Sequence, residues 1–185
     1  TKDGYDCRSL PRLRKGSVEF FTLVGNSWSG SDGYSRSVCF DSLEKLSAEE
    51  AEVLVSRIKA SRFSLNGLKG LEPGVAEQLL KYNGATTSQV LGGTAHAGSL
   101  LLNSLEHISK EDAALLGKLA DVDYLSLDGL NNIDSVVAAG LASFSGVLSL
   151  NGLESISDDS ARELASHGGA TSNNNYWLEL NGLTE

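Results

Sequence analysis

The sequence predicts an α/β repeat protein in which short strands alternate with helices. A six-residue motif, apolar-x-apolar-Asx-small-Leu, occurs six times along the chain. Its copies are VCFDSL, FSLNGL, LLLNSL, LSLDGL, LSLNGL and LELNGL, and they end at Leu43, Leu68, Leu105, Leu130, Leu153 and Leu183. The spacings between these leucines are 25, 37, 25, 23 and 30 residues. A base period of about two dozen residues is the length of one strand-and-helix repeat.

Each copy of the motif begins with a predicted strand. The first and third residues are apolar in every copy, whereas the second is mostly small or polar. This period of two is typical of a short strand that buries one face. We therefore expect strands at residues 38–40, 63–65, 100–102, 125–127, 148–150 and 178–180.

A helix is predicted after each of the first five strands. Four copies have a residue that can cap a helix at the expected start, namely Ser47, Ser109, Asp134 and Ser157. Glu50 and Asp112 follow three residues after the first two of these, where an acidic side chain favours a helix N-terminus. The second copy has Pro73 instead, which suits a first helical position.

The predicted helices share one buried face. Alanine occurs eight residues after each of the first five motif leucines, at Ala51, Ala76, Ala113, Ala138 and Ala161. Leucine occurs eleven residues after them, at Leu54, Leu79, Leu116, Leu141 and Leu164. Positions three apart lie on the same side of a helix, so we expect both columns to pack against the strands.

Three segments do not follow the repeat. Residues 1–37 lack its pattern and are expected to cap the repeats of residues 38–185, since the first repeat must cover an apolar end. Residues 84–98 and 168–177 are insertions between a helix and the next strand, so both are expected at the same edge. We expect them to form a second contact surface, with Tyr176 and Trp177 as its anchor. The same aromatic pair could instead cover the core or an edge.

The repeat resembles the leucine-rich repeat family over residues 38–185. The cysteine-containing type is the most similar, because L-x-L is followed by Ile and Ser, as in Leu148, Leu150, Ile156 and Ser157. The chain departs from that type at the motif leucine, where the family has Asn or Cys. The resemblance implies a right-handed solenoid, with parallel strands on a concave face and helices on a convex face.

In such a solenoid two sets of residues face the concave side. The middle residues of the strands are Cys39, Ser64, Leu101, Ser126, Ser149 and Glu179. The residues two positions later are Asp41, Asn66, Asn103, Asp128, Asn151 and Asn181. In leucine-rich repeat proteins this face usually binds another protein, so the resemblance implies a binding surface here. Alternatively, the Asn/Asp column only shapes the turns, because Asx side chains bond to nearby backbone.

Charge limits the classes of partner. The chain has a formal net charge of −9, with +1 on residues 1–81 and −10 on residues 82–185. This charge disfavours nucleic-acid binding and favours a protein partner with a basic surface. The alternative is that the acidic helix faces only keep the protein in solution. No apolar stretch approaches the roughly 18 residues of a membrane helix, so no membrane insertion is expected.

No catalytic motif supports an enzyme. The sequence lacks a G-x-S-x-G elbow, a Walker loop, a helix-opening G-x-G-x-x-G and H-E-x-x-H. His96, His107 and His167 fall at unrelated positions of the repeat. We therefore expect a non-catalytic binding module without a metal or cofactor. Two alternatives remain: a structural segment of a longer repeat protein, or an enzyme whose site lies on residues 1–37 or 84–98.

The two cysteines bear on the compartment. Cys7 and Cys39 are the only cysteines of the chain, and a disulfide between them would stabilise the N-terminal segment. Such a bridge would imply an oxidising compartment, so a periplasmic, surface or secreted location is expected. Two reduced thiols, and with them a cytoplasmic location, are the alternative.

Overall fold

The computed structural model describes residues 37–41, 43–58, 60–84, 98–167 and 177–184. It contains one sheet of six strands in the described part of the chain, all parallel and in sequence order. The strands are β1 (Ser37–Cys39), β2 (Arg62–Ser64), β3 (Gly98–Leu101), β4 (Val122–Ser126), β5 (Val147–Ser149) and β6 (Leu178–Glu179). The prediction of an α/β fold with parallel strands is confirmed.

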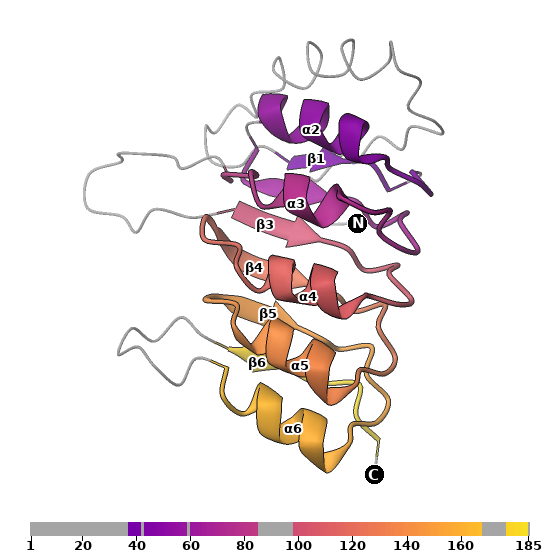
Figure 1. The fold of residues 1–185 in the computed structure, drawn as a ribbon, viewed down its shortest axis with the longest axis vertical. Helices are drawn as coiled ribbons and strands as arrows, with labels where there is room; N and C mark the ends of the chain where they lie inside the picture. Colours follow the sequence, from indigo (N-terminus) through magenta and orange to yellow (C-terminus); the bar gives the residue numbers. More distant parts are fainter. Residues whose placement is uncertain (1–36, 42, 59, 85–97, 168–176, 185) are drawn as a thin grey trace, which may run out of the picture.

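Helices alternate with the strands. They are α2 (Ala48–Arg57), α3 (Val75–Leu79), α4 (Lys110–Leu116), α5 (Ser135–Ala142) and α6 (Asp158–Leu164). Each helix packs against the next one along the chain. Figure 1 shows them as a single column that runs beside the sheet from α2 to α6. The sheet therefore has one face covered by helices and one face opposite them.

Local hydrogen bonds explain where four helices begin. The predicted caps Ser47, Ser109, Asp134 and Ser157 each accept a hydrogen bond from a backbone amide three residues later. In helix α2 the Glu50 carboxylate accepts a 3.0 Å bond from the Ser47 amide in return, which completes a capping box.

The start of α3 corrects one expectation. The first residue of the helix is Val75, and its N-cap is Gly74, with φ 85°. Pro73 lies before that cap, in a turn. Because the left-handed backbone of Gly74 separates it from the helix, Pro73 is not a first helical residue.

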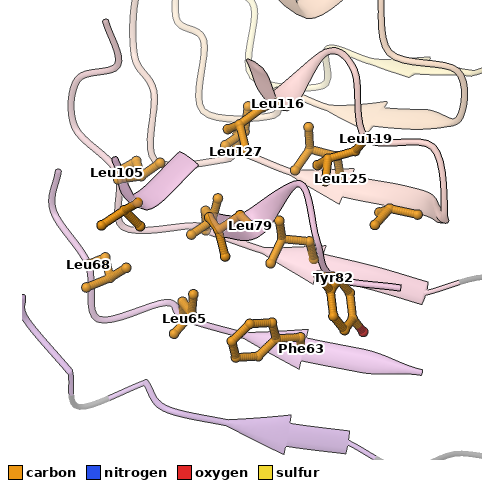
Figure 2. Close-up of a cluster of buried hydrophobic side chains, with 14 of the residues drawn as sticks. Phe63, Leu65, Leu68, Leu79, Tyr82, Leu105, Leu116, Leu119, Leu125 and Leu127 are labelled. Carbon is orange, nitrogen blue, oxygen red and sulfur yellow. The ribbon is translucent and has the colours of Figure 1, made fainter. Parts of the chain in front are cut away.

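The hydrophobic core lies between the helices and the sheet. Figure 2 shows strand residues such as Phe63 and Leu125 beside helix residues such as Leu79 and Leu116. The five leucines of the helix column are all buried, as predicted. Four alanines of the neighbouring column are fully buried as well, but Ala161 on α6 is exposed. Among the described residues no further helix follows α6, so nothing there covers Ala161.

The ends of the first insertion meet. A Cβ on Gly84 would lie 2.2 Å from Cα of Gly98, so the backbone approach leaves no room for a side chain. Gly98 begins β3, and Trp177 immediately precedes β6. Since the strands are parallel, both insertions rejoin the sheet on the same side, at the N-terminal ends of β3 and β6. The rest of the insertions, and residues 1–36 of the expected cap, lie outside the described residues.

Candidate functional site

The sheet face opposite the helices, which we term the distal face, carries three rows of side chains. Successive strand residues alternate between the two faces, so every second residue belongs to the distal face. The first row comprises Ser37, Arg62, Ser99, Tyr124, Val147 and Trp177. The middle row comprises Cys39, Ser64, Leu101, Ser126, Ser149 and Glu179. The third, or Asx row, comprises Asp41, Asn66, Asn103, Asp128, Asn151 and Asn181.

The Asx row forms a continuous ladder across the sheet. In each step a side-chain Oδ1 accepts a hydrogen bond from the backbone amide of the next Asx residue. The five distances are 3.1 Å from Asp41 to Asn66, 2.9 Å from Asn66 to Asn103, 3.4 Å from Asn103 to Asp128, 2.9 Å from Asp128 to Asn151 and 2.9 Å from Asn151 to Asn181. The ladder therefore joins successive turns, at a column two residues before the motif leucine.

Serines of the middle row bond to the same acceptors. Ser64 Oγ donates to Oδ1 of Asp41. Ser126 Oγ lies 2.5 Å from Oδ1 of Asn103. Ser149 Oγ lies 2.6 Å from Oδ1 of Asp128. Each of these acceptors thus serves a hydroxyl and an amide of the next strand, which supports the alternative that this column shapes the turns.

The residues predicted to bind differ widely in exposure. Ser64, Ser126 and Ser149 are at most 1% exposed, so a partner on this face would not reach their hydroxyls. Leu101 is buried too. Five residues of the Asx row are half-buried, namely Asp41, Asn66, Asn103, Asp128 and Asn151. Glu179 is half-buried as well, whereas Asn181 is exposed. The surface of the distal face is therefore formed by its two outer rows, and the serines of the middle row lie beneath it.

Trp177 is the exposed aromatic residue of the first row. Its exposed fraction is 65%. The backbone carbonyl of Trp177 accepts a 2.8 Å bond from the amide of Leu148, which places it beside Val147. Val147 in turn pairs with Tyr124. Tyr176, the other predicted aromatic anchor, lies outside the described residues.

Sequence reasoning missed Tyr124 and Val147. Both are half-buried members of the first row, two residues before the serines that were predicted to face the same side. The alternation that selected the middle row also selects them when it is extended by one step toward the N-terminus. Together with Trp177 they form an aromatic and apolar strip across three neighbouring strands.

The Glu179 carboxylate lies beside this strip. Its Oε2 accepts a 3.4 Å hydrogen bond from the hydroxyl of Tyr124 and a 3.3 Å bond from Nδ2 of Asn151. The same Nδ2 lies 2.8 Å from Oγ of Ser149. Glu179 thus reaches across β5 toward β4, and the ladder holds its carboxylate in place.

Charge on the distal face is uneven. From β3 to β6 its three rows contain the carboxylates of Asp128 and Glu179 and no lysine or arginine among the described residues. Arg62 of β2 is the basic side chain of the first row. This part of the face therefore presents negative charge next to exposed aromatic surface.

The two described histidines, His107 and His167, lie in different repeats. His167 has ring nitrogens 3.4 Å from the carbonyl of Ala142 and 3.0 Å from that of Gly146, and its ring stacks on Phe144. It therefore links the end of α6 to the preceding repeat. His107 lies in the loop before α4, and His96 lies outside the described residues. No three His, Cys, Asp or Glu side chains gather into a metal site in the part of the chain that the structure describes.

Of the two cysteines, Cys39 lies in the described part of the chain, in strand β1. Cys39 is disulfide-bonded in the structure, while Cys7 lies outside the described residues. The pairing of Cys7 with Cys39 stays a prediction. Within the described ranges, no helix has the length and apolar character needed to cross a membrane.

Comparison with known proteins adds no relative: no family model, no curated protein and no solved structure matches the chain.

Proposed function

We propose that the chain is a leucine-rich-repeat-like solenoid that acts as a non-catalytic, protein-binding module through its distal face. The strand order supports the solenoid, because the six strands follow one another in sequence order. A doubly wound fold would instead reverse its order at a switch point. The repeated Asx ladder between neighbouring turns supports the same reading.

The partner is proposed to be a protein with a basic surface. The observation that carries this is the strip of Tyr124, Val147 and Trp177 beside the Glu179 carboxylate. Exposed aromatic residues are enriched in protein interfaces. A rigid acidic face adds attraction for a basic partner and speeds encounter.

A covalent capture experiment tests this function. A photo-reactive amino acid at Ser99, a half-buried residue of the first row, would crosslink a bound protein in the source cell's lysate. The captured protein is then purified, and its dissociation constant is measured with Val147→Arg. We expect at least about a tenfold weaker complex, because the new cation repels a basic partner and breaks the apolar strip.

A matched variant controls for the added charge. Val136→Arg places the same cation on α5, where Val136 is 55% exposed and belongs to the helix side. This variant should bind as the parent does. Equal affinity for the parent and Val147→Arg would reject the distal face as the binding surface.

A second candidate is a structural segment that assembles with another repeat unit. It is favoured by the last described repeat, where Leu183 is 39% exposed and Asn181 ends the ladder at the edge strand β6. Sedimentation of the purified protein over a range of concentrations tests it. Self-association, together with no captured partner at Ser99, would favour this alternative.

A further inference from the structure

An aromatic and acidic cluster lies at one corner of the distal face. Trp177 and Tyr124 stand on either side of Val147 in the first row. Neighbouring strands are about 4.8 Å apart, so the two aromatic residues start from backbones about 10 Å apart. Val147 lies between them at the base. The ring of Tyr124 and the exposed indole of Trp177 thus lie on the same face of neighbouring strands, and the Tyr124 hydroxyl reaches over β5 to Glu179.

The carboxylate of Glu179 belongs to the same cluster. Its Oε2 accepts hydrogen bonds from the Tyr124 hydroxyl at 3.4 Å and from Nδ2 of Asn151 at 3.3 Å. No hydrogen bond to Oε1 is present within the described residues, and no lysine or arginine there pairs with Glu179. The carboxylate is fixed in position while its charge stays unmatched.

We infer that this cluster, the Trp177 site, binds an arginine side chain of the partner protein, an inference that rests on the proposed function. A guanidinium group is planar and weakly hydrated, so it stacks on tryptophan and tyrosine rings. It also pairs with a carboxylate through parallel N–H donors. A lysine ammonium is a compact, strongly hydrated charge and uses the aromatic surface less well. The net charge of −10 on residues 82–185 adds long-range attraction for such a cation.

The peptide acetyl-Gly-Arg-Gly-amide is the probe for a direct test. It is titrated into ¹⁵N-labelled protein while the indole N–H of Trp177 and the side-chain amide of Asn151 are followed by NMR. The indole signal is assigned with Trp177→Phe, because the chain has two tryptophans. We expect saturable shifts of both signals with the arginine peptide, weaker binding of the lysine peptide, and none of the neutral citrulline peptide.

Three variants separate the effects of the Glu179 charge, the Trp177 ring and the net charge on peptide binding. Glu179→Gln keeps the shape and the hydrogen-bond acceptor but removes the charge, and should raise the dissociation constant of the peptide about fivefold. Trp177→Ala should remove the saturable shift of Asn151. Glu163→Gln, which removes the same charge from an exposed position on α6, should bind the peptide as the parent does.

The inference is overturned if neither signal shifts saturably, if the citrulline peptide binds equally well, or if Glu163→Gln weakens binding as much as Glu179→Gln. The last result would assign the effect to net charge. These outcomes are independent of the crosslinking experiment. A captured partner that loses affinity with Val147→Arg but not with Glu179→Gln would uphold the proposed function and reject the arginine site.

Discussion

Oγ of Ser149 donates a 2.6 Å hydrogen bond to Oδ1 of Asp128, a residue 21 positions earlier in the chain. The same oxygen also accepts the backbone amide of Asn151 at 2.9 Å. One carboxylate oxygen therefore satisfies a fully buried hydroxyl and a turn amide of the next strand. Since a buried polar group without a partner is costly, this acceptor has a measurable effect on stability.

Removal of that acceptor should destabilise the protein. We expect Asp128→Ala to lower the free energy of unfolding by about 2 to 3 kcal/mol, because it removes the acceptor of the buried Ser149 hydroxyl proton and of the Asn151 amide. Asp128→Asn keeps Oδ1, and its Nδ2 can donate to Ser126, so a loss below about 1 kcal/mol is expected. Urea unfolding followed by circular dichroism measures both. Equal losses for the two variants would show that the acceptor is not the cause.

Close packing between repeats leaves no room for a side chain at Gly152. A Cβ on Gly152 would lie 1.9 Å from the carbonyl oxygen of Asp128. We expect Gly152→Ala to cost about 1 to 3 kcal/mol, because the neighbouring turn must shift. Gly70→Ala is the matched control, since nothing lies within 4 Å of the added carbon there. Thermal melting should give a lower melting temperature for Gly152→Ala than for Gly70→Ala. Similar melting temperatures for the two variants would contradict the packing argument.

Stability should fall at alkaline pH because of Tyr82. Its side chain is 1% exposed, and its hydroxyl donates a 2.8 Å bond to the carbonyl of Ala60. Burial raises the pKa of Tyr82 well above its ordinary value. Above pH 10 the unfolded chain therefore releases a proton that the folded chain keeps, so the free energy of unfolding falls as the pH rises.

Tyr82→Phe tests this linkage. The variant loses the bond to Ala60 and should be about 1 kcal/mol less stable than the parent at pH 8. Between pH 8 and pH 11 the parent alone should lose about 1.4 kcal/mol through Tyr82. The advantage of the parent at pH 8 should therefore be lost and slightly reversed by pH 11, as measured by urea unfolding at both pH values. A constant difference would mean that Tyr82 ionises equally in the folded and unfolded states.

The helix leucine column should dominate core stability. Leu141 is fully buried between α5 and the sheet, and Leu141→Ala should cost about 2 to 5 kcal/mol. Val136→Ala on the exposed side of the same helix should change stability by less than about 0.5 kcal/mol. Chemical denaturation of both variants checks the contrast. Similar losses would mean that α5 is oriented differently.

Much of the fold could be predicted because its signals are local. The Ser47 cap, the Leu141 column and the alternation around Phe63 each depend on spacing within one repeat, and the structure confirms them. Exposure at the last repeat could not be predicted in this way. Ala161 and Leu183 have the same local sequence as their buried equivalents, but among the described residues they have no later repeat against them.

The candidate site was predictable only in part. A period of two gives the face on which Ser149 lies, but not that the neighbouring Asp128 side chain covers it. The burial of the serine row depends on hydrogen bonds between residues more than 20 positions apart. Glu179 was selected as a concave residue, yet its approach to Tyr124 spans 55 residues of sequence and has no local signature. The cluster around Trp177 therefore emerges only when strands β4 to β6 are placed together.

The hydrogen bonds of the Asx ladder do not depend on how many residues separate two neighbouring members of the row. Asn66 and Asn103 are 37 residues apart and Asp128 and Asn151 are 23 apart, yet both bonds measure 2.9 Å. Extra residues between a helix and the next strand are thus accepted without a change in the framework. In evolution or in the laboratory, the junction between a helix and the next strand can therefore accept loops of different length and chemistry while the stacked scaffold stays constant.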